Sequence, residues 1–398
     1  AISFFRDIAF GNVQPAFSYD GLNYKPSCIS IPWQMAKHVE YKCIDGLIDV
    51  LEPPMPEVRL ILRQLRRFQR YATDSVFIDQ KIISTKVSTI NTALIQKLII
   101  LGALDTVNVE LTDKLLIESV KTAQQSFGLL NDGVLRSTTL KELNVPVAER
   151  IGQLNLSVNY YRWLYCLSRQ QPVVVVNIPA AYLHVYQEGR SILEMRMVVG
   201  KPSTPTPTLS SSITEVVLYP YWVVPYSIAS KELLPMLKRN PAFIDQGNYQ
   251  VLNRNGQIMD HATINWATLS ANNFPYIIRQ STGCDNALGV IKLNFYNPYS
   301  VYLHDTPLKS YFNLNKRYFS HGCMRLGKPM ELARLALGNN AIAVDTLCEK
   351  CLLNQKPVSV PVKEPFPVIV WYNPVGIGEA GRLTYYEDIY NKIRGSNN

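Results

Sequence analysis

The pattern of apolar residues changes abruptly near Pro172. Before it, apolar residues recur at helical spacing, as in residues 58–71, which predicts amphipathic helices. After it come a run of valines over residues 173–176 and an aromatic-rich alternation over residues 182–186, both typical of strands. The chain has 398 residues, enough for two or three domains of about 150 residues each. We therefore predict an α+β multi-domain protein with a helical first part and a mostly β second part.

The helical part divides into a scaffold, a module and a linker. Residues 1–87 mix short helices and loops, which we assign to a helical scaffold. Residues 88–148 predict a compact helical module, and residues 149–171 predict a scaffold helix that links it to the β part. Within the module, helices are expected over residues 89–101, 115–127 and 138–143.

Arginines line the polar face of the helix expected over residues 58–71. A stripe of this kind is either an anion-binding face or an ordinary solvated surface, and we favour the solvated surface. The arginines of the stripe are Arg59, Arg63, Arg66, Arg67 and Arg70.

Residues 172–398 predict a β-sandwich-like domain. Glu188 and Gly189 form the expected turn of a hairpin, and residues 193–199 pair back onto the preceding strand. Further strands are expected over residues 215–224, 290–295, 300–303 and 368–372.

An insertion of about residues 226–289 interrupts these strands and is richer in helix and loop signals. We expect short helical turns over residues 231–239, because Pro235 limits the helix there, and a second helix over residues 263–272. Such a long insertion is either a functional lid or a cover for the sheet edge.

The charge balance is basic, with 40 Lys and Arg against 31 Asp and Glu, and a net charge of +9. It permits an anionic partner, but no recognition motif for nucleic acid accompanies it, so we do not expect nucleic-acid binding. The chain is 47% hydrophobic and 18% charged, which excludes disorder as its main state. No apolar run reaches ~18 residues, so no membrane-spanning helix is expected.

The seven cysteines are too scattered for a zinc array, and we expect no metal and no cofactor. We interpret Cys28, Cys43, Cys166 and Cys284 as structural or buried. Cys348 and Cys351 form a CxxC pair, which predicts a disulfide or two reduced thiols. An odd number of cysteines leaves at least one thiol free, as a nucleophile requires.

Residues 320–326, with the sequence Ser-His-Gly-Cys-Met-Arg-Leu, carry the chemistry. Cys323 is followed by a helical segment over residues 329–337, so we expect it at a helix mouth, where the helix dipole favours thiolate. Gly322 permits a tight turn whose N–H groups face a developing oxyanion. Upstream, His304 ends a predicted strand and has the pKa range of a general base.

These two motifs, His304-Asp305-x-Pro307 and the Ser-His-Gly-Cys-x-Arg-Leu stretch, resemble the YkuD-type L,D-transpeptidases, cysteine enzymes that cross-link peptidoglycan. The resemblance extends through most of residues 172–395. The long insertion, which the resemblance identifies as a capping subdomain, is similar to that of the large multi-domain YcbB-like branch. In the helical module, Phe127-Gly128-Leu129 and Asp132-Gly133-Val134 resemble the peptidoglycan-binding family PG_binding_1.

The resemblance also implies roles for the residues of the site. Cys323 matches the nucleophile, His304 the general base, and His321 a residue that supports the thiol region. The backbone N–H groups of Gly322 and Cys323 match the oxyanion donors.

Two further positions carry supporting roles in this resemblance. Arg325 either holds the loop or binds a substrate carboxylate, and we favour the loop. Tyr302 matches an aromatic residue beside the catalytic histidine, and it could equally be a packing residue of the strand.

The implied reaction forms 3→3 peptidoglycan cross-links through a cysteine thioester, with stem peptides as donor and acceptor and release of the terminal D-Ala. Carbapenem-type β-lactams should acylate the same cysteine. With water or a protein lysine as acceptor, the same cysteine would give an L,D-carboxypeptidase, an endopeptidase or wall anchoring. An inactive peptidoglycan-binding scaffold is the alternative from another class. The resemblance implies the periplasm, with a possible inner-membrane tether outside these residues.

Overall fold

The computed structural model describes residues 1–72, 80–105, 110–348, 352, 355–379 and 381–393. It divides into two compact units. Unit 1 comprises Ala1–Glu194, Pro207–Ser210 and Val368–Asn398. Unit 2 comprises Met195–Thr206 and Ser211–Pro367, so the unit boundaries fall within strands β4, β5 and β14.

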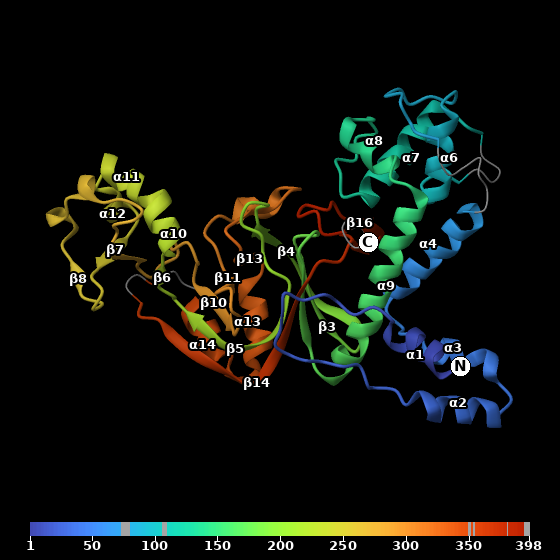
Figure 1. Cartoon of the computed structure of the whole chain (residues 1–398), viewed down its shortest axis with the longest axis horizontal. Coiled ribbons are helices and arrows are strands. Elements are labelled where there is room, and N and C mark those ends of the chain that lie inside the picture. Colours follow the sequence, from blue (N-terminus) through green and yellow to red (C-terminus); the bar gives the residue numbers. More distant parts are fainter. Residues whose placement is uncertain (73–79, 106–109, 349–351, 353–354, 380, 394–398) are drawn as a thin grey trace. The chain divides into compact units, whose positions relative to one another are not determined.

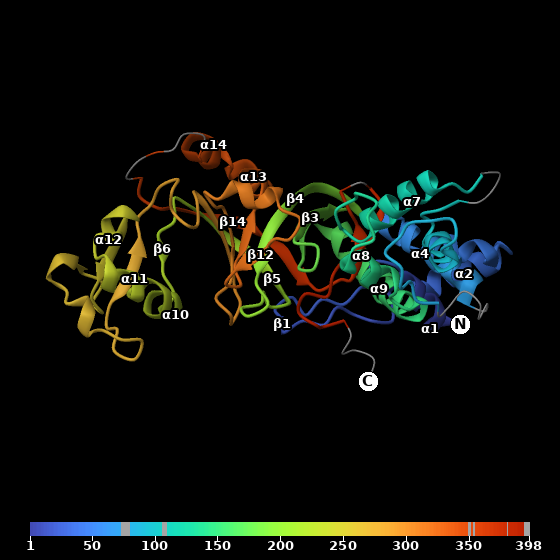
Figure 2. The same ribbon diagram turned by 90° about the horizontal axis from the view of Figure 1, so that it is seen from above.

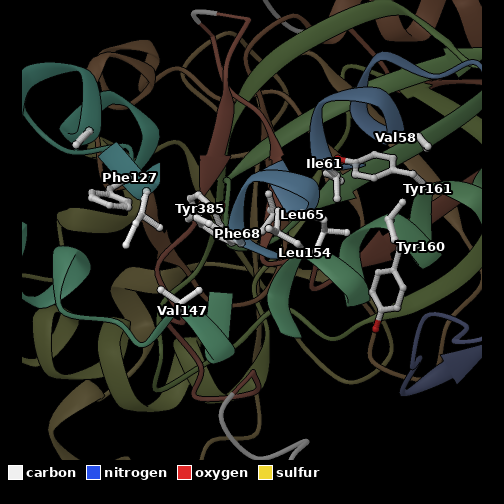
Figure 3. Close-up of a cluster of buried hydrophobic side chains, with 14 of the residues drawn as sticks. Val58, Ile61, Leu65, Phe68, Phe127, Val147, Leu154, Tyr160, Tyr161 and Tyr385 are labelled. Atoms are coloured by element: carbon white, nitrogen blue, oxygen red, sulfur yellow. The ribbon is translucent and has the colours of Figure 1, made fainter. Parts of the chain in front are cut away.

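Helices α4 (Pro56–Ala72) and α9 (Val147–Gln170) lie side by side in unit 1 and form its centre (Figure 1). The helix predicted over residues 58–71 is therefore confirmed, as is the one over residues 149–171. Their facing side chains are buried, including Ile61, Phe68 and Leu154 (Figure 3). Each such side chain contributes about 1.5–3 kcal/mol of hydrophobic stabilisation, so this seam is a main source of the unit's stability.

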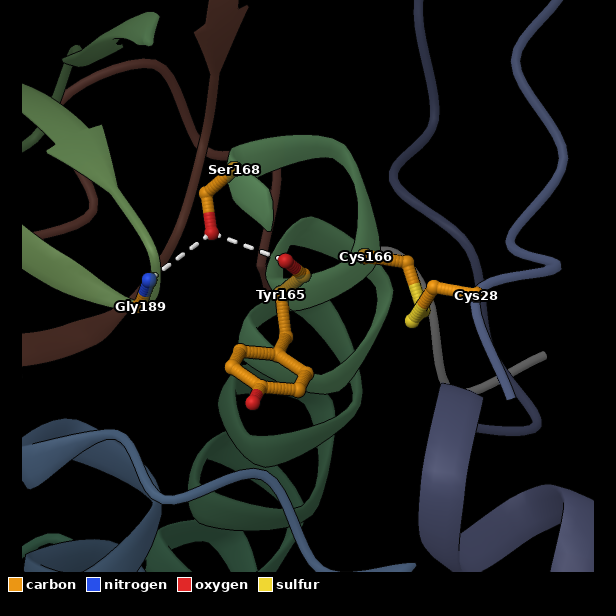
Figure 4. The surroundings of a disulfide bond; sticks show 5 residues. All are labelled: Cys28, Tyr165, Cys166, Ser168 and Gly189. Atoms are coloured by element: carbon orange, nitrogen blue, oxygen red, sulfur yellow. Dashed lines mark hydrogen bonds between the residues drawn. A yellow bond between two sulfur atoms is a disulfide. The ribbon is translucent and has the colours of Figure 1, made fainter. Parts of the chain in front are cut away.

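Short helices at the start of the chain form a small separate core in unit 1. They are α1 (Ile2–Phe10), α2 (Ile31–Glu40) and α3 (Leu47–Leu51). A disulfide between Cys28 and Cys166 joins this segment to α9 (Figure 4). Near the same end of α9, Ser168 Oγ accepts a hydrogen bond from Gly189 N–H at 3.1 Å and donates one to Tyr165 O at 2.8 Å (Figure 4).

The helical module contains α6 (Thr92–Leu101), α7 (Asp113–Ser126) and α8 (Ser137–Leu143), which confirms the helices predicted there. Side-chain caps define two of their starts, because Asn91 Oδ1 and Thr112 Oγ1 accept hydrogen bonds from the first turns. Buried Gln124 bonds the following turn through Gly133 N–H and Val134 O. These contacts order the module.

The β elements of unit 1 include the predicted hairpin. Strand β2 (Val173–Asn177) is buried throughout and pairs antiparallel with β3 (Tyr182–Gln187). At the turn, Glu188 has φ 50° and Gly189 has φ 75°, the left-handed conformations of a two-residue hairpin turn. The chain then enters β4 (Arg190–Gly200). On its other side, β2 pairs in parallel with the end of β14 (Val358–Trp371).

Smaller β elements complete unit 1. Strand β1 (Tyr19–Asp20) pairs in parallel with the start of β5 (Leu209–Leu218). Strands β15 (Val375–Ile377) and β16 (Leu383–Tyr385) form a two-stranded sheet. Arg150 of α9 lies over the ring of Tyr385, with 4.5 Å from the guanidinium carbon to the ring centroid.

The main sheet of unit 2 has the strand order β5-β10-β11-β13-β4. Its members include β10 (Ile291–Phe295), β11 (Leu303–His304) and β13 (Met324–Leu326), while β12 (Tyr318–Ser320) pairs with β4. Helices α13 (Pro329–Leu337) and α14 (Ile342–Cys348) follow, and lie side by side (Figure 2).

One predicted strand, over residues 215–224, is interrupted. Strand β5 ends at Leu218, and β6 (Trp222–Val223) belongs to a different sheet, with order β6-β9-β7-β8. The break occurs because Tyr219 has φ 52°, a left-handed conformation, and Pro220 cannot donate a ladder hydrogen bond.

The insertion has its own buried core, which includes Leu237, Val251 and Ile278. Its strands are β6, β7 (Tyr249–Leu252), β8 (Ile258–Met259) and β9 (Ile277–Gln280), and its helices are α10 (Tyr226–Ile228), α11 (Leu234–Arg239) and α12 (Phe243–Gln246) (Figure 1).

In the insertion, the helical structure predicted over residues 231–239 is confirmed but begins earlier, and the helix predicted over residues 263–272 is wrong. The chain is helical from residue 226 to residue 239, because a π-helical turn, Ala229–Leu233, joins α10 to α11 and Pro235 falls in the first turn of α11. Residues 263–272 contain no α-helix, only the 3₁₀ turn Trp266–Thr268 and a bridge between Ser270 and Asn273.

Candidate active site

The register of neighbouring strands brings the predicted site residues together in unit 2. Strands β11 and β13 run parallel, with His304 opposite Arg325, and Met324 N–H donates to Tyr302 O at 3.1 Å. Tyr302 is therefore level with Cys323. Alternate residues of a strand face the same side. The side chains that share one face of the sheet are therefore those of Tyr302, His304, Cys323 and Arg325.

A fifth residue on that face was missed by the sequence analysis. Lys292 of β10 lies opposite His304 in an antiparallel pair, and its Nζ is 4.2 Å from the centroid of the Tyr302 ring. Burial lowers the pKa of Lys292, and the negative charges of Cys323 and Glu215 oppose that shift. Only the strand register identifies this lysine, since no local motif surrounds it.

Cys323 is a free cysteine with a largely buried thiol. Burial raises its pKa, while hydrogen bonds from the backbone and hydroxyl of Tyr302 and the charges of Lys292 and Arg325 act in the opposite direction. The expected helix mouth is wrong, because Cys323 directly precedes strand β13 and α13 begins only at Pro329. Its thiol therefore rests protonated at neutral pH.

His304 is buried and held in one tautomer. Its Nδ1 lies 2.5 Å from the carbonyl oxygen of Asp305 and must donate there, since a carbonyl can only accept. The lone pair on Nε2 is therefore the one that can take a proton. Burial lowers the pKa of His304 to about 3, with a further lowering from Arg325, so the imidazole is neutral.

The carboxylate of Asp305 bonds a backbone N–H group and a lysine, whereas the His304 imidazole bonds the backbone carbonyl of Asp305. Its Oδ2 accepts from Val290 N–H at 3.1 Å, and its Oδ1 pairs with Lys309 Nζ. Gly289 has φ 59°, and a Cβ there would approach Asp305 Oδ2 to 2.3 Å. Glycine is thus required beside this carboxylate.

The loop that carries Cys323 is fixed by two hydroxyl groups. Thr206 Oγ1 donates to Gly322 O at 2.9 Å, and Ser320 Oγ donates to Cys323 O at 2.5 Å. Gly322 N–H in turn donates to Ser320 Oγ at 3.2 Å. Without substrate the Gly322 N–H is thus engaged with Ser320, and its role as a backbone donor to an oxyanion stays a prediction.

Arg325 does not hold the loop as we expected. Its Nε and Nη1 are buried and have no hydrogen-bond partner among the described residues. Its guanidinium carbon lies 5.8 Å from the centroid of the Tyr311 ring. Another arginine, Arg317, holds the neighbouring loop by donating to Met197 O at 3.1 Å and Leu314 O at 2.7 Å.

His321 is exposed on the same loop and contacts the insertion. Its Nε2 lies 2.8 Å from Glu232 Oε1 and 3.4 Å from Lys201 Nζ. Burial raises the pKa of the Tyr302 hydroxyl, and Trp222, from the insertion side, acts in the opposite direction. None of these three residues could be predicted as a partner from the motif, because all of them are remote from it in sequence.

The remaining cysteines and possible metal ligands have structural explanations. Besides Cys28 and Cys166, Cys284 is disulfide-bonded. Cys348 is free and buried, so it is not in the predicted CxxC disulfide, while Cys351 lies outside the described residues. Within the described ranges, no group of three or more His, Cys, Asp or Glu side chains could hold a metal ion.

The sequence around this face has known relatives. Residues 171–360 match the YkuD family, whose model describes an L,D-transpeptidase catalytic domain. All five side chains of the shared face lie inside this YkuD region. A putative L,D-transpeptidase of Haemophilus influenzae is 37% identical over 217 residues, which cover 54% of this chain and 44% of that protein. The chain thus spans less than half the length of this curated relative.

Solved structures are similar to half of the chain. An L,D-transpeptidase from Mycobacterium smegmatis is 17% identical, with 50% of this chain and 58% of that chain covered and a TM-score of 0.24. L,D-transpeptidase 3 from Mycobacterium tuberculosis, in complex with a faropenem-derived adduct, is 14% identical, with 50% and 60% covered and a TM-score of 0.24. No helix in the described part of the chain is long and apolar enough to cross a membrane.

Proposed function

We propose that this chain is an L,D-transpeptidase in which Cys323 is the nucleophile and His304 the general base. The observation that carries the proposal is the parallel register of β11 and β13, which puts a free thiol and a neutral imidazole on one face. Because Nδ1 of His304 is occupied, the ring offers Nε2 to the thiol proton. The match of residues 171–360 to the YkuD family supports the same reaction.

In the proposed reaction, the sulfur of Cys323 attacks the carbonyl that joins the third stem residue to the terminal D-Ala. The thiol proton passes to Nε2 of His304 and then to the amine of the leaving D-Ala. A thioester remains, and the side-chain amine of a second stem attacks it. This step forms the 3→3 cross-link and returns the thiol.

The shifts in the pKa values of Cys323 and His304 describe the resting state of this pair. Burial raises the pKa of Cys323 and lowers that of His304, so the proton stays on sulfur before substrate arrives. Proton transfer is then coupled to attack. The backbone N–H groups of Gly322 and Cys323 are the proposed oxyanion donors, and Tyr302 steadies the sulfur through its hydroxyl.

The remaining assignments belong to the same proposal. The insertion acts as a capping subdomain of the YcbB-like kind, and residues 88–148 bind peptidoglycan. The protein works in the periplasm on wall stem peptides. Water or a protein lysine as acceptor would instead give trimming or wall anchoring, and product analysis by mass spectrometry distinguishes the three outcomes.

The decisive experiment is the intact mass of the protein after incubation with a carbapenem, for wild type and Cys323→Ala together. A carbapenem presents a strained carbonyl to the same thiol, so a single adduct is expected on wild type alone. An adduct that persists on Cys323→Ala would assign the reaction to another residue. The absence of any adduct, with no cross-linked product from stem peptides, would favour an inactive binding scaffold.

A further inference from the structure

Apolar side chains are exposed on the turn that follows the His304 motif. Leu308 and Leu314 flank the 3₁₀ turn Lys309–Asn313, and Tyr311 lies at its centre. These residues are spaced three positions apart, which places their side chains along one side of such a turn. The exposed fractions of Leu308 and Leu314 are 47% and 43%, so the turn presents an apolar side to the solvent.

The strand before Cys323 adds a second aromatic ring to this side. Phe319 of β12 is 42% exposed, and its ring centroid lies 5.3 Å from that of Tyr311. Single exposed hydrophobic residues are common, but a group of them in contact is typical of an interaction surface. We call Leu308, Tyr311, Leu314 and Phe319 the aromatic platform.

The aromatic platform is anchored to the fold. Phe312, which follows Tyr311, is buried. Arg196 Nη1 donates to Phe312 O at 2.8 Å, and Arg317 Nη1 donates to Leu314 O at 2.7 Å. The turn therefore holds the exposed side chains in place before a ligand arrives, which lowers the entropic cost of binding.

The aromatic platform also borders the proposed active site. The guanidinium carbon of Arg325 lies 5.8 Å from the centroid of the Tyr311 ring, and Arg325 shares its sheet face with Cys323. Along the chain, Phe319 directly precedes the cysteine motif. A substrate whose carbonyl reaches Cys323 can therefore place another of its groups on the platform.

The chemistry of this surface fits a sugar ring. A pyranose has an apolar C–H face, which packs on aromatic and aliphatic side chains, and a rim of hydroxyl and acetamido groups. Asn313 and Asn315 flank Leu314 and are exposed, so their amides can exchange hydrogen bonds with such a rim. Amides beside apolar side chains favour this amphipathic ligand over a wholly apolar protein surface.

We propose that the aromatic platform is a saccharide subsite, which binds a sugar of the glycan strand that carries the donor stem peptide. This inference rests on the function proposed above, since the peptide must reach Cys323. It adds to that function a preference for donors that retain their sugar. Binding energy from a sugar remote from the attacked carbonyl raises kcat/KM.

The test compares two donors, a stem tetrapeptide alone and the same peptide linked to its disaccharide. Thioester formation is followed by intact mass, and release of the terminal residue gives kcat and KM. For wild type we expect kcat/KM to favour the disaccharide donor by about 3- to 10-fold, as for the contacts of one aromatic ring. In Phe319→Ala this ratio should fall close to one through a higher KM for the disaccharide donor, and Phe319→Tyr should keep it.

Phe4→Ala is the matched control. Phe4 is also an exposed phenylalanine, but it lies on α1 of unit 1 and outside the YkuD region, so its removal should leave the ratio at the wild-type value. Equal kcat/KM for the two donors in wild type would overturn the saccharide subsite even if the Phe319 variants fail to fold. In that case thioester formation would still support the proposed function.

Two further outcomes are informative. A preference for the disaccharide donor that persists in Phe319→Ala would overturn the saccharide subsite, because another surface would then bind the sugar. Failure of both donors and of a carbapenem to acylate Cys323 would overturn both proposals.

Discussion

His321 of the cysteine loop and Glu232 of the insertion are joined by a hydrogen bond of 2.8 Å between Nε2 and Oε1. Glu232 lies in the π-helical turn Ala229–Leu233, and His321 precedes Gly322 and Cys323 directly. The contact therefore links the insertion to the loop that carries the nucleophile. Both side chains are partly exposed, at 35% and 51%, which limits the strength of the link.

Removal of this contact should loosen the insertion. In Glu232→Ala, backbone amides of residues 229–233 should exchange with deuterium up to about fivefold faster, since a partly exposed ion pair contributes about 1 kcal/mol or less. Hydrogen exchange with mass spectrometry measures this directly. Glu331→Ala, which changes an exposed carboxylate on α13, should leave these amides unaffected. Equal exchange in Glu232→Ala and wild type would mean that the contact does not restrain the insertion.

The resting thiol of Cys323 should react as a protonated cysteine. Burial raises its pKa above the ordinary value of 9.0, so the thiolate fraction is small near neutral pH and grows as the pH rises. Alkylation of Cys323 by iodoacetamide, followed by peptide mapping, should therefore keep accelerating above pH 9. Lys292→Gln should slow it near neutral pH, where the lysine is charged and favours the thiolate. A rate that levels off below pH 7 would instead indicate a stable thiolate–imidazolium pair.

Local sequence patterns predicted much of this architecture. The hairpin at Glu188 and Gly189, the helix over residues 58–71 and the helices of the module follow from spacing and turn chemistry that neighbouring residues determine. Tyr302, His304 and Cys323 could be chosen from short motifs, and their common face follows from the alternation of two strands.

The wrong or missing predictions concern features that depend on contacts between residues distant in the sequence. The position of Cys323 before a strand, rather than at a helix mouth, depends on the pairing of β13 with β11 and β4. Arg325 belongs to the cysteine motif and Arg317 does not, yet it is Arg317 that donates to the loop carbonyls. Lys292 reaches the site only through its register with His304. No periodicity in a single segment contains this information.

A buried carboxyl group in unit 1 predicts an unusual pH dependence of stability. Glu57 accepts from Tyr186 Oη at 2.6 Å, while its Oε2 is buried without a partner among the described residues. Burial raises the pKa of Glu57 above its ordinary value of 4.5, and the hydrogen bond from Tyr186 opposes this. A raised pKa in the folded state means that stability is highest below pH 4.5 and falls as the pH rises through the folded pKa.

Across that window, each pH unit should cost about 1.4 kcal/mol of stability from this group. Glu57→Gln removes the titration, so its loss of stability between pH 4 and pH 7 should be smaller than that of wild type. Urea unfolding of unit 1, followed by tryptophan fluorescence, measures the difference. The exposed Glu118→Gln serves as the control and should retain the wild-type pH dependence. The same pH dependence in Glu57→Gln would show that Glu57 is not the group responsible.

The disulfide between Cys28 and Cys166 should stabilise unit 1 substantially. It closes a loop with a sequence separation of 138 residues and joins the first helices to α9. The chain-entropy model gives about 5 kcal/mol for a loop of this length, and measured values are often nearer 2–4 kcal/mol. Cys28→Ser should therefore lower the free energy of unfolding of unit 1 by about 2–5 kcal/mol. Cys43→Ser changes an exposed free thiol and should have an effect within about 0.5 kcal/mol. If the urea midpoint of unfolding is the same for wild type and both variants, the disulfide does not constrain the unfolded chain as proposed.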